Sequence, residues 1–224
     1  MTNGSSQGLF VVVAVVIFGI FVSISYLLFR DQLTPSLASI FSDSISFSIR
    51  SQYSSIATLK DFNSSNPDVA TIKSKKDSEL IYSHDGSSIV YNIYIKPIFF
   101  KPGQQYALEY EIELLDGIVE TLGGHNASFE GGTPLASIKN FYIDGELKGN
   151  YYSAVAFTLN KGEKHKIKVL LDTRNETEDS LKKSMGVYIQ PNRSYTSIIE
   201  NTEYNGRQSP EYTVKISNLI IYEI

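Results

Sequence analysis

The sequence contains no cysteine and no tryptophan, and it has no excess of basic residues. Without cysteine, the chain cannot form a disulfide scaffold, a zinc–thiolate site, an iron–sulfur cluster or a cysteine nucleophile. Its 20 basic and 24 acidic side chains give a formal net charge of −4, whereas a general nucleic-acid binder needs a basic face to neutralise phosphates. We therefore expect no nucleic-acid partner.

Charge is also scarce in the N-terminal part, where Arg30, Asp31, Asp43 and Arg50 are the only charged side chains before Lys60. The stretch 9–29 has none, and as a helix it would be about 31 Å long, close to the thickness of a bilayer core. A soluble core helix is seldom apolar on every face, and a secretory signal has a basic start and a shorter apolar run. We therefore expect a transmembrane anchor, with lipid-facing residues that include Leu9, Phe10, Phe18, Phe21, Leu28 and Phe29.

The orientation of this anchor is weakly encoded. Arg30 follows the apolar stretch and no basic residue precedes it, which by the positive-inside rule would leave the domain in the cytoplasm. One arginine beside Asp31 is a small bias, and long domains can cross the membrane regardless of such a bias. The absence of cysteine and the β-rich domain favour a location outside the cytoplasm, at the cell surface or in an extracellular filament.

The rest of the chain divides into a serine-rich stalk or linker at 31–88 and a domain at 89–224, after an N-terminal unit at 1–30. The domain is dominated by alternation of apolar and polar residues, which predicts half-buried strands. Asp144-Gly145 predicts a tight hairpin, since glycine readily takes positive φ. A short helix is expected near Glu176–Ser184. Strands are expected at 89–95, 106–114, 138–143, 154–159, 165–171, 186–189, 195–199, 212–216 and 219–224.

The pattern of strands and turns resembles the jelly-roll modules of the carbohydrate-binding and galactose-binding-like type. The resemblance is carried by FFKPGQQYALEY at 99–110 and YTVKISNLIIYEI at 212–224, and the stretch 187–193 is similar to modules of phage tail proteins. It implies an all-β, antiparallel jelly-roll-like sandwich behind the N-terminal helix. Such modules often carry a structural calcium ion, for which Asp85-Gly86-Ser87 and Asp172–Asp179 are the places to consider. The residues themselves predict no metal site and no other cofactor.

The N-terminus has a second resemblance, to type IV pilins and related filament subunits. Gly8 is followed by Leu9, an apolar helix and a β-rich head, as in that family. The family also has basic residues before the glycine and a glutamate at the fifth mature position. Here no basic residue precedes Gly8, and Val13 occupies the fifth position. The resemblance implies self-assembly through the N-terminal helix.

Few residues are candidates for chemistry. Glu109, Glu111 and Glu113 share one face of a strand, where they could act as paired carboxylates of a glycosidase or could pair with Lys166 and Lys168 across strands. Glycan binding needs flat apolar platforms, which only tyrosine and phenylalanine can supply in a chain without tryptophan. The candidate ligand-binding residues are Tyr151, Tyr152, Tyr188, Tyr195 and the loop residue His125.

The sequence therefore predicts a non-enzymatic, single-pass membrane protein. Its β-sandwich would bind or adhere outside the cytoplasm, to a glycan or another surface protein, or would build a surface structure. One alternative is a pilin-like filament subunit with its apolar helix packed in the filament core. A more remote alternative is a jelly-roll glycosidase or lyase.

Overall fold

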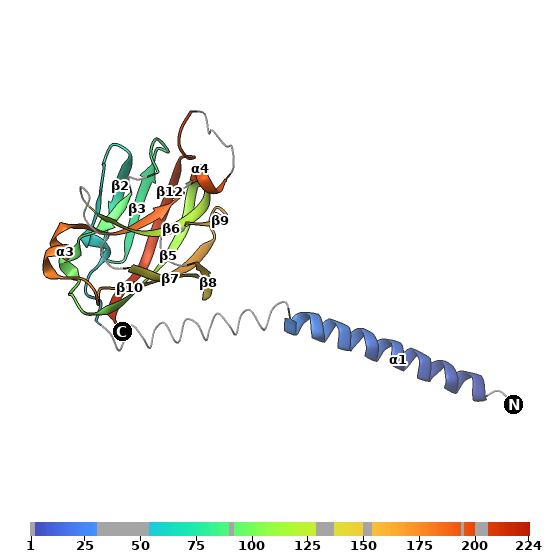
Figure 1. The fold of residues 1–224 in the computed structure, drawn as a ribbon. Helices are drawn as coiled ribbons and strands as arrows, with labels where there is room; N and C mark the ends of the chain where they lie inside the picture. Colours follow the sequence, from blue (N-terminus) through green and yellow to red (C-terminus); the bar gives the residue numbers. More distant parts are fainter. Residues whose placement is uncertain are drawn as a thin grey trace. The chain divides into compact units, whose positions relative to one another are not determined.

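The structure is a computed structural model of the chain, and it describes residues 3–30, 54–89, 92–128, 137–149, 154–193, 195–199 and 206–224. It consists of two compact units, of which the first holds the N-terminal helix and the second comprises Ser54–Ile224. The two units are described separately below. Figure 1 shows the helix and the β-rich unit with their element labels.

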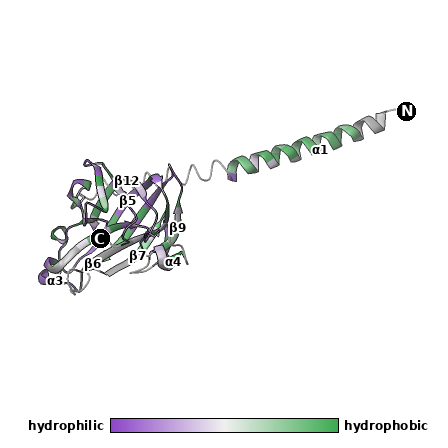
Figure 2. Ribbon diagram, turned by 90° about the horizontal axis from the view of Figure 1, so that it is seen from above, coloured by the Kyte–Doolittle hydropathy of each residue, from purple (hydrophilic) through white to green (hydrophobic). Residues whose placement is uncertain are grey.

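Helix α1 runs over Asn3–Leu28. Every residue from Gly8 to Arg30 is exposed, including the six predicted lipid-facing residues, and in Figure 2 most of the helix ribbon has the green of apolar residues. Its Gly8–Leu28 segment is long and apolar enough to cross a membrane, although a signal sequence shares those properties. The Ser23 hydroxyl donates to the carbonyl of Gly19 at 2.8 Å, so this hydroxyl needs no water. The Arg30 guanidinium lies 5.9 Å from the Tyr26 ring centroid.

The second unit is a sandwich of two sheets, and every paired strand in the described sheets is antiparallel. The five-stranded sheet has the order β1-β4-β11-β6-β9, and the seven-stranded sheet has the order β2-β3-β12-β5-β10-β7-β8. The strands are β1 Phe62–Ser64, β2 Ala70–Lys75, β3 Glu79–His84, β4 Ile93–Ile95, β5 Gln105–Gly117, β6 Val119–Ser128, β7 Ser137–Ile143, β8 Glu146–Gly149, β9 Val155–Leu159, β10 Lys164–Asp172, β11 Ser184–Pro191 and β12 Tyr212–Glu223. The predicted class, a jelly-roll-like antiparallel sandwich preceded by an apolar helix, is confirmed.

The sandwich begins earlier in the chain than expected. Strands β1, β2 and β3 lie within the predicted linker at 31–88, and Leu59, Phe62, Leu80 and Tyr82 are fully buried in the core. The polar loops between these short strands gave the segment the composition of a linker. The expectation of a linker is therefore corrected for residues 59–84, while 31–53 lie outside the described residues.

The core forms because alternating residues of the two sheets face one another. On β5, Leu108, Tyr110, Ile112 and Leu114 are buried, and the three glutamates between them are only partly buried. Facing residues of the five-stranded sheet include Ile93 and Ile95 of β4 and Val187 and Ile189 of β11. The alternation predicted from the sequence is thus confirmed for the central strands of both sheets.

One turn and one irregularity within a strand show how local sequence shapes the seven-stranded sheet. The predicted hairpin joins β7 to β8 through Asp144 and Gly145, whose φ angles of 50° and 84° are those that tight hairpin turns need. The predicted strands at 212–216 and 219–224 are one strand, β12. Its pairing with β5 shifts register between Ser217 and Ile220, where Asn218 has a φ of 55°.

The predicted strand at 195–199 is wrong, because this segment is the short helix α4, Tyr195–Ile198. The backbone nitrogen of Tyr195 donates to the carbonyl of Asn192, and that of Ile199 donates to the carbonyl of Tyr195. The apolar residues Tyr195, Ile198 and Ile199 have the i, i+3, i+4 spacing of a helix, which the sequence prediction overlooked. The expected short helix is confirmed as α3, Glu178–Lys183.

Candidate functional site

The outer face of the five-stranded sheet carries a row of polar and aromatic residues across four strands. Asn63 of β1 lies opposite Tyr94 of β4, Tyr94 opposite Tyr188 of β11, and Tyr188 opposite His125 of β6. Residues directly opposite on antiparallel strands share a face, and the neighbours of Tyr94 and Tyr188 along their strands belong to the core. The side chains of Tyr94 and Tyr188 therefore face away from the core.

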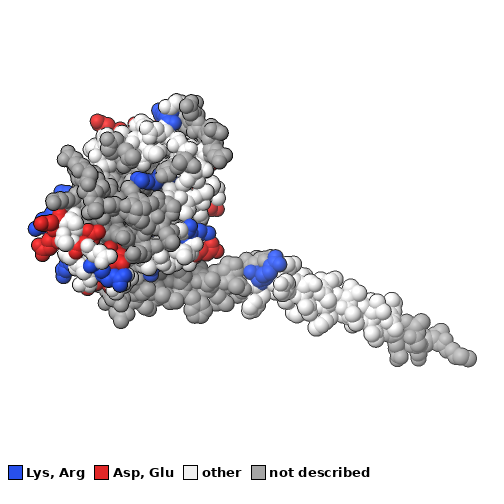
Figure 3. All heavy atoms as spheres, in the orientation of Figure 1, with Lys and Arg blue, Asp and Glu red and all other residues white. Residues whose placement is uncertain are grey.

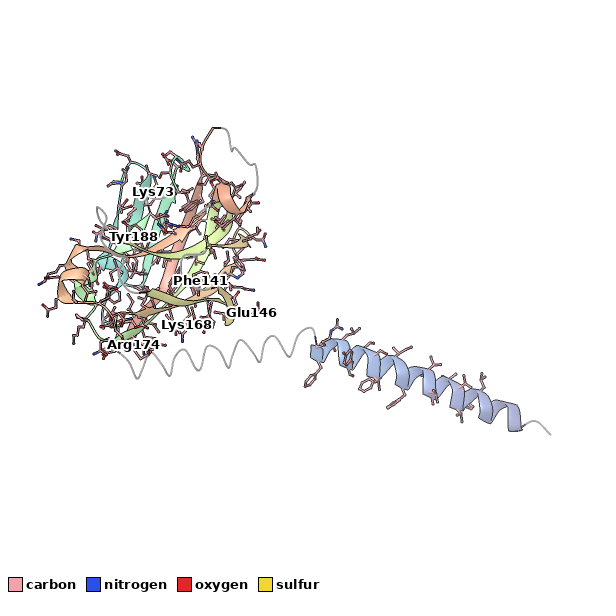
Figure 4. All side chains as sticks on the ribbon, in the orientation of Figure 1. Lys73, Phe141, Glu146, Lys168, Arg174 and Tyr188 are labelled. Atoms are coloured by element: carbon pink, nitrogen blue, oxygen red, sulfur yellow. The ribbon has the colours of Figure 1, made fainter. Side chains whose placement is uncertain are left out.

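The two tyrosines of this row stack on each other. Their ring centroids are 5.4 Å apart and their planes meet at 24°, which is an offset-stacked geometry. Tyr188 is only 3% exposed, whereas Tyr94 is partly exposed. Burial and the neighbouring Tyr94 raise the pKa of Tyr188 to about 12. Tyr188 thus supports the ring of Tyr94, which is the one of the pair that a ligand can reach. Figure 4 labels Tyr188 on its strand.

Beside the tyrosines lies a polar pair made by Gln190 and Arg193. Gln190 is the next outward residue of β11 and lies opposite Gly123 of β6. The Nη1 atom of Arg193 donates to Oε1 of Gln190 at 3.3 Å. A β-carbon on Gly123 would lie 3.3 Å from the β-carbons of both Arg193 and Ala154. The missing side chain of Gly123 therefore lets Arg193 lie close over the strand.

A corner at Asn192 fixes the backbone that carries Arg193. Asn192 has a φ of 53° and is 1% exposed, and asparagine tolerates this left-handed conformation better than most residues. Its side chain accepts from the nitrogen of Glu120 at 2.9 Å and donates to the carbonyl of Ile118 at 2.8 Å. The Thr121 hydroxyl donates to the carbonyl of Arg193 at 2.9 Å. The guanidinium is thus attached to a well-held backbone.

The outer face of the seven-stranded sheet is different, because it carries a ladder of opposite charges. Lys168 of β10 lies opposite Glu109 of β5 and forms a 2.8 Å ion pair with it. Lys215 of β12 lies opposite Glu113 and pairs with it at 2.6 Å. Although partial burial would lower the pKa of Lys168, the Glu109 carboxylate raises it above its usual value. The predicted cross-strand pairing is confirmed for Glu109 with Lys168, whereas Glu113 pairs with Lys215 of β12, which was not predicted. Figure 3 shows further acidic and basic side chains gathered around α3.

The predicted site residues have different locations. Tyr188 and His125 are brought together in the row described above, although only the backbone of His125 is described. Tyr195 lies apart from them: it is 2% exposed, and its hydroxyl donates to Oε2 of Glu120 at 2.8 Å, which attaches α4 to β6. Tyr151 and Tyr152 lie outside the described residues.

The two loops considered for calcium do not fit a calcium site. In the Asp85-Gly86-Ser87 loop, one oxygen of the Asp85 carboxylate accepts hydrogen bonds from both the backbone nitrogen and the hydroxyl of Ser87. The Asp172 carboxylate accepts two bonds from the guanidinium of Arg174, at 3.0 and 2.7 Å. Arg174 thus supplies the positive charge at this loop. Among the described residues, no three acidic or histidine side chains gather as a metal would require.

Sequence reasoning missed Tyr94, Gln190 and Arg193. Alternation in Ile93-Tyr94-Ile95 and in Val187-Tyr188-Ile189-Gln190 does place the polar members on one face, so Tyr94 and Gln190 were detectable. Arg193 was not detectable, because its location depends on the left-handed corner at Asn192 and on a glycine in another strand.

No protein-family model and no curated protein matches this chain. Among solved structures, the CBM22-1 xylan-binding domain of Xyn10C from Paenibacillus barcinonensis is similar over 77% of this chain and 96% of that domain, with a TM-score of 0.46 and 5% identity.

Two other solved structures are similar at lower scores. The CBM22-1–GH10 modules of the Clostridium thermocellum xylanase Xyn10B are similar over 77% of this chain and 28% of theirs, with a TM-score of 0.40 and 8% identity. Tailspike protein 4 of bacteriophage CBA120 is similar over 74% of this chain and 20% of its own, with a TM-score of 0.25 and 10% identity. At these scores, none of the three carries an inference about what this chain binds.

Proposed function

We propose that the protein is a membrane-anchored surface protein whose β-sandwich binds a saccharide, without catalysis, on the outer face of the five-stranded sheet. The observation that carries this proposal is the contrast between the two outer faces. One face carries a Glu–Lys ladder, as a solvated surface does. The other carries stacked tyrosines, amides and a guanidinium.

This combination of groups suits a saccharide. A sugar ring has an apolar C–H face that packs on an aromatic ring, and hydroxyls that need both donors and acceptors. Tyr94 offers a supported, partly exposed ring, and Asn63 beside it offers an amide. Arg193 adds a partly exposed guanidinium, which Gln190, itself 1% exposed, holds by a hydrogen bond. We include His125 as a further residue of this surface, because its backbone lies opposite Tyr188.

The absence of catalysis is proposed from the carboxylates of β5. Glu109 accepts from both Lys168 and the Tyr222 hydroxyl at 2.8 Å, and Glu113 pairs with Lys215. A general acid of a glycosidase needs a raised pKa and a free path to the glycosidic oxygen. Here the lysine ammonium groups occupy both carboxylates, which leaves neither a free path to a glycosidic oxygen.

A binding experiment on the full chain would test the saccharide site. The chain would be kept in a detergent without a sugar headgroup, because glycoside detergents would compete, and screened on an array of oligosaccharides. We expect binding that Tyr94→Ala reduces at least about tenfold, which corresponds to roughly 1.4 kcal/mol. The matched control is Tyr142→Ala, since Tyr142 is a partly exposed tyrosine on the outer face of the other sheet. Equal loss in both variants, or no binding, would contradict the proposal.

The anchor and its orientation are proposed from α1. All of its described side chains are exposed, so an apolar helix of this length needs lipid or other chains to cover it. In intact cells, we expect added protease to digest the sandwich and to leave a membrane-bound fragment. Full protection would contradict the outward topology. A mature chain that begins after Gly8 and forms filaments would favour the pilin-like alternative.

A further inference from the structure

Arg193 differs from the other arginines that the structure describes in the sandwich. The Arg174 guanidinium is bound by the Asp172 carboxylate at 2.7 Å, and the Arg207 guanidinium is paired with Glu211. Arg193 is partly buried, and its guanidinium has one hydrogen bond, at 3.3 Å, to the neutral side chain of Gln190. Within the described part of the chain, no carboxylate pairs with it.

Among the residues that the structure describes, no anionic group compensates the charge of Arg193. Burial lowers the pKa of its guanidinium, yet arginine stays protonated in proteins. The adjacent strand does carry a carboxylate, Glu120, but its Oε2 atom accepts the Tyr195 hydroxyl at 2.8 Å. A partly desolvated cation without an anionic partner is unfavourable by itself and favours binding of an anion.

The backbone holds this cation in place. The Asn192 corner and the Thr121 hydroxyl hold the main chain of Arg193. Gly123 allows its β-carbon to lie close over β6. Gln190 contacts the same guanidinium and follows Tyr188 on the outer face of β11. The charge is thus held beside Gln190, two residues along β11 from Tyr188.

We propose that the saccharide bound at this face is acidic, and that the Arg193 guanidinium pairs with a carboxylate of a uronic acid unit. This inference rests on the proposed saccharide site and adds its ligand class. The planar guanidinium matches a carboxylate with two parallel hydrogen bonds. A uronic acid unit on the ring of Tyr94, or next to the unit that packs there, would bring its carboxylate toward Arg193.

The test uses an oligogalacturonide and its fully methyl-esterified form, in which a methyl group replaces the negative charge of each carboxylate. Both would be titrated into the full chain in a zwitterionic detergent. We expect the acid to bind at least about tenfold more tightly than the ester, a typical gain for a desolvated charge pair. Raising the ionic strength should weaken binding of the acid more than binding of the ester.

Variants of Arg193 separate this inference from the proposed function. Arg193→Gln should lower the affinity for the acid much more than that for the ester, so that the two affinities become similar, while Arg207→Gln should change neither. Arg193→Lys keeps the charge and should retain part of the preference for the acid. Thermal unfolding of each variant identifies any that fail to fold, and the salt dependence of the unmutated chain tests the inference without a variant.

Each outcome has a definite meaning. If acid and ester bind equally and Tyr94→Ala weakens both, the ligand is neutral: the inference is wrong and the saccharide site stands. If Arg193→Gln weakens acid and ester alike, Arg193 binds hydroxyls instead of a carboxylate, and the inference is again wrong. If no array saccharide and neither oligogalacturonide binds, both proposals fail.

Discussion

The side-chain oxygen of Asn192, after the end of β11, lies 2.9 Å from the backbone nitrogen of Glu120 near the start of β6. This hydrogen bond joins strands that are far apart in the sequence, and it belongs to a residue in left-handed conformation. Asn192 therefore has two separable roles, one in its backbone angle and one in its amide. The first prediction distinguishes them.

Asn192→Gly keeps the left-handed backbone accessible but leaves the Glu120 nitrogen and the Ile118 carbonyl without the amide. We expect it to lower the free energy of unfolding by about 2 kcal/mol, as for unsatisfied buried groups. Asn192→Ala should cost roughly 1 kcal/mol more, because alanine is strained at this φ. Urea unfolding followed by circular dichroism would measure both. Equal losses would mean that the backbone angle contributes nothing.

Gly117 and Gly145 have nearly the same backbone φ but differ in the room for a side chain, so comparing them separates steric clash from backbone strain. Their φ angles are 83° and 84°. A β-carbon on Gly117 would meet the Glu211 carbonyl and lie 2.7 Å from the α-carbon of Tyr212, whereas nothing lies within 4 Å at Gly145. We expect Gly145→Ala to cost about 1–2 kcal/mol from backbone strain alone. Gly117→Ala should cost clearly more or prevent folding, and comparable stabilities would contradict this.

The ion pair of Lys168 and Glu109 should contribute measurably to stability. The pair is 2.8 Å long, and the side chains are 40% and 21% exposed. A double-mutant cycle with Lys168→Met and Glu109→Gln should give a coupling of about 0.5–1 kcal/mol, the upper part of the range for cross-strand pairs. The control is the more exposed pair of Lys161 and Asp116, for which we expect no measurable coupling. High salt should reduce the first coupling, and equal couplings would contradict the prediction.

Alkaline pH should destabilise the sandwich. Burial raises the pKa of Tyr82, Tyr110 and Tyr212, and that of Tyr188 to about 12, while tyrosine in an unfolded chain titrates near about 10. Between these values the unfolded state releases phenolic protons that the folded state keeps. The free energy of unfolding must therefore fall as the pH rises through this window.

Urea unfolding at a series of pH values, from about 8 upward in steps of about half a unit, would measure how the free energy of unfolding changes with pH. Tyr188→Phe removes one of the four groups and should make the slope shallower. Absorbance of the phenolate should show part of the tyrosines titrating only when the chain unfolds. A flat stability profile above the pKa of free tyrosine would contradict the prediction.

The sequence predicted the fold better than the site, for reasons visible in particular residues. Alternation along β5, β10 and β12 and the Asp144-Gly145 turn are local signals, and they placed the strands and the hairpin correctly. The strands between Phe62 and His84 were missed because they are short and lie between polar loops. Tyr195 was misassigned because the segment is short and its β-branched isoleucines suggested a strand, although Tyr195, Ile198 and Ile199 have helical spacing.

The candidate site depends on contacts that no local pattern encodes. Tyr94 and Tyr188 are far apart in the sequence, and they stack only because β4 and β11 are neighbours. The location of Arg193 needs both a left-handed residue before it and Gly123 on another strand. Composition could indicate tyrosine as the aromatic platform, but only the strand order could select which tyrosine.

The strand order also sets a sequence of events during synthesis. β12 lies between β3 and β5 in the seven-stranded sheet, although it is the last of the twelve strands along the chain. At ordinary translation rates of about 5–20 residues per second, α1 leaves the ribosome roughly 10 to 40 s before β12 is made. Until then β3 and β5 lack the strand that joins them. Under the membrane anchoring proposed above, the apolar helix would meet the insertion machinery while the sheet is still incomplete, so the domain would reach the membrane in a state that can still be threaded across it.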